Sequence, residues 1–216
     1  MPLKSKMLIK TVRRVFTDSE MHALIARLSV LYEDLRIEMF GTADPSVGRL
    51  DYSSEAYRKN YFLRRSLATL VEIEETFRLL DVNVDFQKVK DNFDRKNAIR
   101  WNRAIRFFKR YGPILKRVRN DIGGHFGYAA ARYAIKNIES QTVAKIELAR
   151  EGSRGVGVKL HFAGEIAIYA LVRHRGDKKP EEYAEYIIRI IAIGYRQAIH
   201  SIDAINACYL WDRFRG

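Results

Sequence analysis

Cysteine, proline, tryptophan and long apolar runs are all scarce in this chain of 216 residues. Its single cysteine, Cys208, rules out a disulfide within the chain and favours a reducing compartment. The most apolar stretch, 187–195, is interrupted by Arg189 and is too short to cross a bilayer. Residues 1–10 carry the positive charges of a signal peptide without the continuous apolar segment that should follow them. We therefore expect a cytoplasmic protein that is neither exported nor inserted into a membrane.

Recognisable metal, nucleotide and nucleophile motifs are also missing. The five histidines, at positions 22, 125, 161, 174 and 200, form neither a His-Glu-x-x-His motif nor a site with paired cysteines. The glycine-rich segment 152–157 lacks the lysine pattern of a phosphate-binding loop and the spacing of a dinucleotide-binding fingerprint. No serine or cysteine lies in a nucleophile elbow. We expect no bound metal and no cofactor.

Acidic residues are few relative to basic ones. The chain has 39 Lys and Arg against 26 Asp and Glu, a formal net charge of +13, which favours RNA or another polyanion as a partner. Its content of 47% hydrophobic and 30% charged residues is ordinary for a globular protein, and the length suits one domain over 1–216. The first 16 residues contain no acid and form a predicted basic arm.

No acidic residue occurs between Asp94 and Asp121, whereas ten basic ones do. Six of these basic residues are the predicted substrate-binding set: Arg100, Arg103, Arg106, Arg110, Lys116 and Arg117. The alternative is that the run is simply the solvated face of a helix.

Apolar residues recur at helical spacing through most of the chain, which predicts a mainly α fold. The expected architecture is a bundle of about five to six helices with a small β-hairpin insertion near residues 142–162, where the pattern changes to alternation around a glycine-rich turn.

Capping and breaking residues predict where these helices begin and end. The expected helices run from the capping residues 17–20 to Gly41, from Ser53 or Ser54 to about Asp81, from about Asp85 to just before Gly112-Pro113, from Pro113 to the paired glycines 123–124, over Phe126–Ile138, over Gly164–Val172, and onward from Pro180.

Residues 119–125, with the sequence RNDIGGH, bring an arginine, a polar amide and a histidine together directly after the basic run. The arginine fork can hold phosphate charge, and histidine has an ordinary pKa of about 6.5, near neutrality. The segment resembles the signature of the HEPN superfamily (higher eukaryotes and prokaryotes nucleotide-binding), in which an arginine, usually followed by a polar residue, precedes a histidine by four to six intervening residues. Here five residues separate Arg119 from His125, and the polar residue is Asn120.

The resemblance implies a metal-independent endoribonuclease, of the toxin or phage-defence kind, in which two motifs face each other across a homodimer. An antitoxin or defence partner belongs to the same expectation. Arg119, His125 and Asn120 are then the catalytic residues. His125 would move a proton at the ribose 2′-hydroxyl or at the leaving 5′-oxygen, Arg119 would stabilise charge on phosphorus, Asn120 would orient the histidine or touch phosphate, and Asp121 would restrain Arg119.

Other interpretations of the same residues exist. Arg119 would instead pair with a carboxylate while His125 caps a helix end. A non-catalytic HEPN-like module would bind RNA or nucleotide, or dock a partner protein, without cleavage. A metal-dependent enzyme of the helical-bundle type would lose activity with a chelator.

Overall fold

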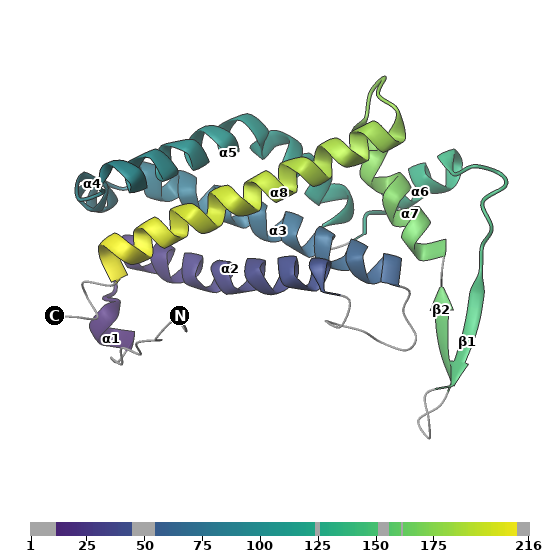
Figure 1. Cartoon of the computed structure of the whole chain (residues 1–216), viewed down its shortest axis with the longest axis horizontal. Coiled ribbons are helices and arrows are strands. Elements are labelled where there is room, and N and C mark those ends of the chain that lie inside the picture. The colour runs from purple at the N-terminus through teal and green to yellow at the C-terminus, as the bar shows by residue number, and fades with distance from the viewer. Residues whose placement is uncertain (1–11, 45–54, 124–125, 151–155, 161, 211–216) are drawn as a thin grey trace, which may run out of the picture.

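The computed structural model describes residues 12–44, 55–123, 126–150, 156–160 and 162–210. Four long helices form its body: α2 (Glu20–Ala43), α3 (Glu55–Val82), α5 (Arg95–Ile122) and α8 (Pro180–Ile205). They lie alongside one another, with α3 packed against both α2 and α5, and α5 packed against α8 (Figure 1). The mainly α fold predicted from the sequence is confirmed.

Shorter elements extend this body at both ends. The short helices α1 (Val12–Val15) and α4 (Val84–Asp91) lie at one end, and α6 (Tyr128–Asn137), α7 (Phe162–Leu171) and the 3-10 turn η1 (Val172–His174) lie at the other (Figure 1). A π-helical turn, η2 (Asn206–Leu210), continues α8. No described helix has an apolar stretch long enough to cross a membrane.

Within the region predicted as a hairpin, β1 (Ile146–Arg150) and β2 (Val156–Leu160) pair antiparallel, with Ile146 opposite Leu160 and Arg150 opposite Val156. The pair extends away from the helices (Figure 1), and the turn predicted between the strands, 151–155, lies outside the described residues.

The first long helix begins where its capping residues predict but ends later. The side chain of Ser19 accepts a hydrogen bond from the His22 amide, so Ser19 is the N-cap of α2. The predicted end at Gly41 is wrong, because α2 continues to Ala43. A Cβ on Gly41 would lie 2.7 Å from the Phe62 ring, so this glycine allows α2 and α3 to approach closely and does not end the helix.

The basic helix also differs from the prediction. In place of a single helix from Asp85 to Gly112, the chain breaks after Asp91 and starts a new helix at Arg95. The break has a local cause, because the Asp94 side chain accepts a hydrogen bond of 2.7 Å from the Asn97 amide and caps the new helix.

Pro113 does not begin a separate helix but lies inside α5, which bends along its length (Figure 1). A proline inside a helix costs about 3 kcal/mol relative to alanine. Burial of Leu115, Val118 and Ile122 after the proline, at roughly 1.5–3 kcal/mol each, outweighs that cost.

Glu38 of α2 is a buried carboxyl group between α2 and α3. Its side chain is 8% exposed, and its Oε1 accepts a hydrogen bond of 3.0 Å from the Thr69 hydroxyl and lies 3.5 Å from Arg65 Nε. Its Oε2 has no hydrogen-bond partner among the described residues. Burial raises the pKa of Glu38 from 4.5 to about 7, and the Thr69 hydrogen bond and the Arg65 charge oppose that rise.

We predict that Glu38→Gln stabilises the protein at alkaline pH. Because the folded-state pKa exceeds the unfolded one, ionisation of Glu38 lowers the free energy of unfolding as the pH rises from about 4.5 to about 7. Glutamine keeps the acceptor for Thr69 without the charge, so at pH 8 the free energy of unfolding should rise by roughly 1–3 kcal/mol, with little change at pH 4. Urea unfolding at both pH values measures this. The exposed Glu33→Gln on the same helix is the control, and equal effects of the two variants would contradict the prediction.

Candidate functional site

The segment 119–125 lies at the C-terminal end of α5. Arg119 is half-buried and Asn120 is exposed in the last turn of the helix, which ends at Ile122. The predicted interruption at the paired glycines is therefore confirmed, and α6 begins five residues beyond Gly123, at Tyr128. Gly124 and His125 lie outside the described residues, so the predicted pairing of Arg119 with His125 stays a prediction.

Gly123 allows the chain to turn sharply at the end of α5. Its amide donates a hydrogen bond of 2.7 Å to the Arg119 carbonyl. A Cβ at this position would lie 2.5 Å from the same carbonyl oxygen and 2.6 Å from Arg119 Cγ. The side chain of Arg119 thus runs past Gly123 at the end of the helix, in space that any other residue at position 123 would fill.

Arg64 of α3 holds the next part of the chain. Its Nε donates a hydrogen bond to the carbonyl of Ile122, one of the carbonyls that the end of α5 leaves without a helical partner. Its guanidinium also lies over the Phe126 ring, 5.5 Å from the ring centre. Arg64 therefore fixes the entry and the exit of the connection between α5 and α6.

Asp121 does not restrain Arg119, which corrects the prediction made from the sequence. Residues two apart on a helix point about 200° away from each other around its axis, so the two side chains diverge. Asp121 instead accepts hydrogen bonds from Arg173 Nη1 at 2.9 Å and from His174 Nε2 at 2.6 Å. The side chains of Asp121, Arg173 and His174 are 14%, 31% and 26% exposed, so the cluster is sheltered but reaches the surface.

Arg119 has no carboxylate within ion-pair distance among the described residues. The alternative that it is held in a salt bridge is therefore not supported for the described part of the chain. Its cationic fork remains able to bind an external anion.

Four of the six predicted substrate-binding residues share one face of α5. Their spacing of three, four and seven residues places them in one row, the arginine stripe, which consists of Arg103, Arg106, Arg110 and Arg117. All four are exposed. The other two lie off this row: Arg100 is half-buried and donates to the Asn97 side chain at 3.3 Å, and Lys116 is exposed on a neighbouring face.

The arginine stripe leads to the Asp121 cluster. Asp121 follows Arg117 by four residues and so lies on the same face of α5. Beside it, Arg173 lies in η1, and Arg175, Lys178 and Lys179 lie with Asp177 in the turn between η1 and α8. Lys178 Nζ lies 4.3 Å from the centre of the ring of Tyr186 in α8, a cation–π contact.

Tyr183, at the start of α8, is packed close to the same stripe. Burial raises the pKa of the Tyr183 hydroxyl, and the nearby positive charge of Arg117 opposes this rise. The stripe of α5 therefore lies beside the first turns of α8, which carry the acidic Glu181 and Glu182. The basic surface consists of the arginine stripe and the basic residues of 173–179.

Arg64, Arg173 and His174 are not among the residues predicted from the sequence. Arg173 and His174 lie 52 and 53 positions from Asp121, and only the packing of η1 beside α5 and α6 brings them together. An adjacent arginine and histidine in the segment 173–179, which has four Lys and Arg against one Asp, was the one signal in the sequence.

No group of three or more His, Cys, Asp and Glu side chains in the described part of the chain is arranged to hold a metal ion. No protein-family model, curated protein or solved structure matches the chain. The HEPN resemblance thus depends on the motif and its surroundings alone.

We predict that Gly123→Ala destabilises the fold. The added methyl group would overlap the Arg119 carbonyl and Cγ, and moving them disturbs the end of α5, which should lower the free energy of unfolding by about 1–3 kcal/mol. Urea denaturation monitored by circular dichroism measures this. Asn102→Ala, at an exposed position of the same helix, is the control and should change stability by less than about 0.5 kcal/mol. A Gly123→Ala protein as stable as the control would refute the close approach.

Proposed function

We propose that this protein is a metal-independent endoribonuclease of the HEPN type, with Arg119, Asn120 and His125 as its catalytic residues. The observation that carries the proposal is an arginine without a carboxylate partner among the described residues, in the last turn of a helix whose exposed face is a row of arginines. Phosphodiester chemistry needs these two features together: a cation available to the reacting phosphate and a basic surface that holds the rest of the backbone.

The chemistry follows from the groups that the motif supplies. Attack of a ribose 2′-oxygen on the adjacent phosphorus displaces the 5′-oxygen and gives a 2′,3′-cyclic phosphate and a 5′-hydroxyl. His125 transfers a proton at one of these two oxygens, and Arg119 stabilises the charge that builds up on the phosphoryl oxygens. Asn120, exposed beside Arg119, orients the histidine or donates to phosphate.

The arginine stripe supplies affinity for the RNA backbone without sequence preference. Each phosphate that a cation neutralises releases counterions, so binding of this kind weakens steeply with salt. The four Lys and Arg residues of 173–179, in η1 and the turn after it, extend the same surface. The proposal includes what the resemblance implies for the rest of the system: a cytoplasmic homodimer with its two motifs facing each other, and a toxin or defence role with an antitoxin or defence partner.

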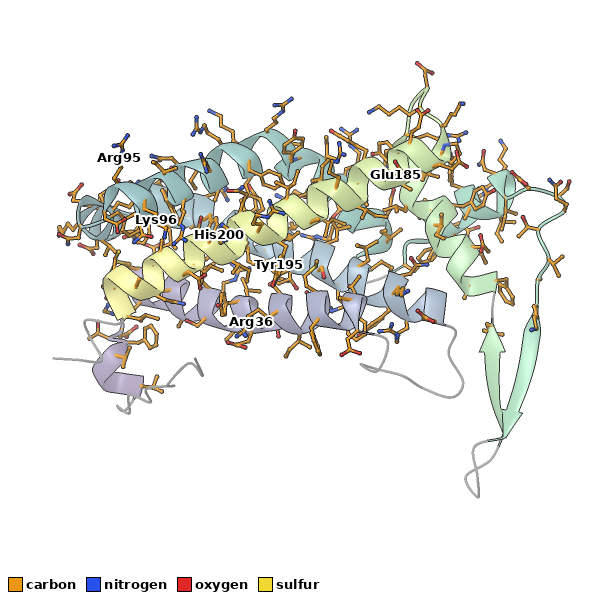
Figure 2. All side chains as sticks on the ribbon, in the orientation of Figure 1. Arg36, Arg95, Lys96, Glu185, Tyr195 and His200 are labelled. Atoms are coloured by element: carbon orange, nitrogen blue, oxygen red, sulfur yellow. The ribbon has the colours of Figure 1, made fainter. Side chains whose placement is uncertain are left out.

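We predict that purified protein cleaves single-stranded RNA in the presence of EDTA and that Arg119→Ala and His125→Ala each lower kcat by roughly 10²–10³-fold. Arg27→Ala and His200→Ala are the matched controls and should retain activity, because Arg27 pairs with Glu75 on α3 and His200 lies exposed on α8 (Figure 2). The cyclic phosphate ends of the products identify the reaction. Loss of cleavage with EDTA would instead indicate a metal-dependent enzyme, and binding without cleavage a non-catalytic module.

We predict that the triple variant Arg103→Gln, Arg110→Gln, Arg117→Gln binds single-stranded RNA more weakly. Each phosphate that the variant no longer neutralises should reduce the slope of log Kd against log salt by roughly 0.7. Fluorescence anisotropy over a range of salt concentrations measures both the affinity and the slope.

The control removes three charges elsewhere: Arg27→Gln, Arg36→Gln and Lys88→Gln, each from a cation with a carboxylate partner, on α2 and α4. Figure 2 labels Arg36 on α2, away from α5. An equal loss of affinity in both triple variants would show that net charge, and not the stripe, holds the RNA.

A further inference from the structure

His174 has the surroundings of a proton-transfer residue, although it lies outside the Arg119–His125 motif. Its Nε2 and Asp121 Oδ2 are 2.6 Å apart, and its side chain is 26% exposed. Its Nδ1 has no hydrogen-bond partner among the described residues. A carboxylate thus fixes one ring nitrogen, and the other is left for a proton that can be exchanged with a ligand.

The carboxylate fixes the orientation of the ring. An aspartate hydrogen-bonded to one nitrogen of a histidine holds the ring in place and leaves the other nitrogen to exchange a proton. The geometry therefore suits a general acid, with Nδ1 as the donating atom.

The position of His174 brings it within the basic surface. Asp121 continues the arginine stripe of α5 by one turn after Arg117, and Arg173 binds the other oxygen of Asp121. An RNA backbone that follows the stripe reaches His174 where α5 ends.

Asp121 and Arg119 both border the connection between α5 and α6. The Asp121 carbonyl accepts a hydrogen bond of 2.8 Å from the Gly127 amide, and Arg119 lies against Gly123. Both residues thus lie in the last turn of α5, at the end of the helix that the arginine stripe reaches.

We propose that His174, positioned by Asp121, is the proton donor to the leaving 5′-oxygen in RNA cleavage, an inference that rests on the proposed function. A base in the site removes the 2′-hydroxyl proton, the 2′-oxygen forms its bond to phosphorus, and the bond from phosphorus to the 5′-oxygen breaks. The Nδ1 proton of His174 passes to that oxygen, which leaves a 5′-hydroxyl and a neutral imidazole. Asp121 is a positioning residue.

The test measures how fast the full-length protein cleaves two RNA substrates. One is a short RNA with a single cleavable linkage, and the other has sulfur in place of the bridging 5′-oxygen at that linkage. A thiolate leaves without protonation, so a missing proton donor affects only the oxygen substrate. His174→Gln keeps a side-chain amide that can donate to Asp121 but has no exchangeable acid.

We expect His174→Gln to lower kcat on the oxygen substrate by roughly 10²–10³-fold with KM nearly unchanged, and to cleave the sulfur substrate within about threefold of the wild type. Asp121→Asn should show the same pattern with a smaller reduction in kcat. His200→Gln, at an exposed histidine of α8, is the matched control and should leave both substrates unaffected (Figure 2).

Thermal unfolding of each variant shows whether the fold is kept. If His174→Gln does not fold, the test uses Asp121→Asn instead, and asks whether this variant cleaves the sulfur substrate at nearly the wild-type rate. Equal slowing of both substrates, or a fully active His174→Gln, would overturn the role of His174 while RNA cleavage by the wild type leaves the proposed function standing. A wild type that cleaves neither substrate would overturn both.

Discussion

Pro113 has no backbone N–H and so removes a helical hydrogen bond from the middle of α5. The helix nevertheless continues, because the apolar residues after Pro113 are buried in the core. Leu115, Val118 and Ile122 are all buried there. If the helix ended at Pro113, each of these side chains would lose a free energy of burial of about 1.5–3 kcal/mol. The continuity keeps Arg103, Arg110, Arg117 and Asp121 in one row. The whole basic surface thus depends on apolar burial on the opposite side of the same helix.

The end of α5 poses an electrostatic problem that the cations around it resolve. A helix C-terminus carries a partial negative charge and carbonyls without helical partners, which disfavours a phosphate at that place. Arg64 donates to the Ile122 carbonyl, and Arg173 and His174 surround the Asp121 carboxylate. These negative groups are therefore paired with cations, and Arg119 forms no ion pair with a described carboxylate. Because the Ile122 carbonyl and the Asp121 carboxylate are already paired, they oppose the binding of an anion near this end less strongly.

Local sequence rules predicted the features that depend on local chemistry. The capping segment 17–20 begins α2, Pro180 opens α8, and α5 ends before Gly123, because each acts through its own backbone or the next turn. The rules failed where distant packing decided the outcome. Capping rules place the end of α2 at Gly41, yet this glycine lies inside the helix against Phe62. Spacing along α5 predicts the arginine row, but no spacing rule joins Asp121 to residues more than fifty positions away.

The Asp121 cluster ties η1 to α5, and the proposed proton transfer uses an atom that this tie leaves out. One cation suffices to compensate a carboxylate, and the bond from Arg173 already provides it. The second oxygen lies 2.6 Å from Nε2 of His174, whose side chain is about one quarter exposed. Each oxygen of a carboxylate can accept a hydrogen bond, so a structural tie accounts for both partners. The proposed proton donor additionally uses Nδ1 of His174, which has no hydrogen-bond partner among the described residues.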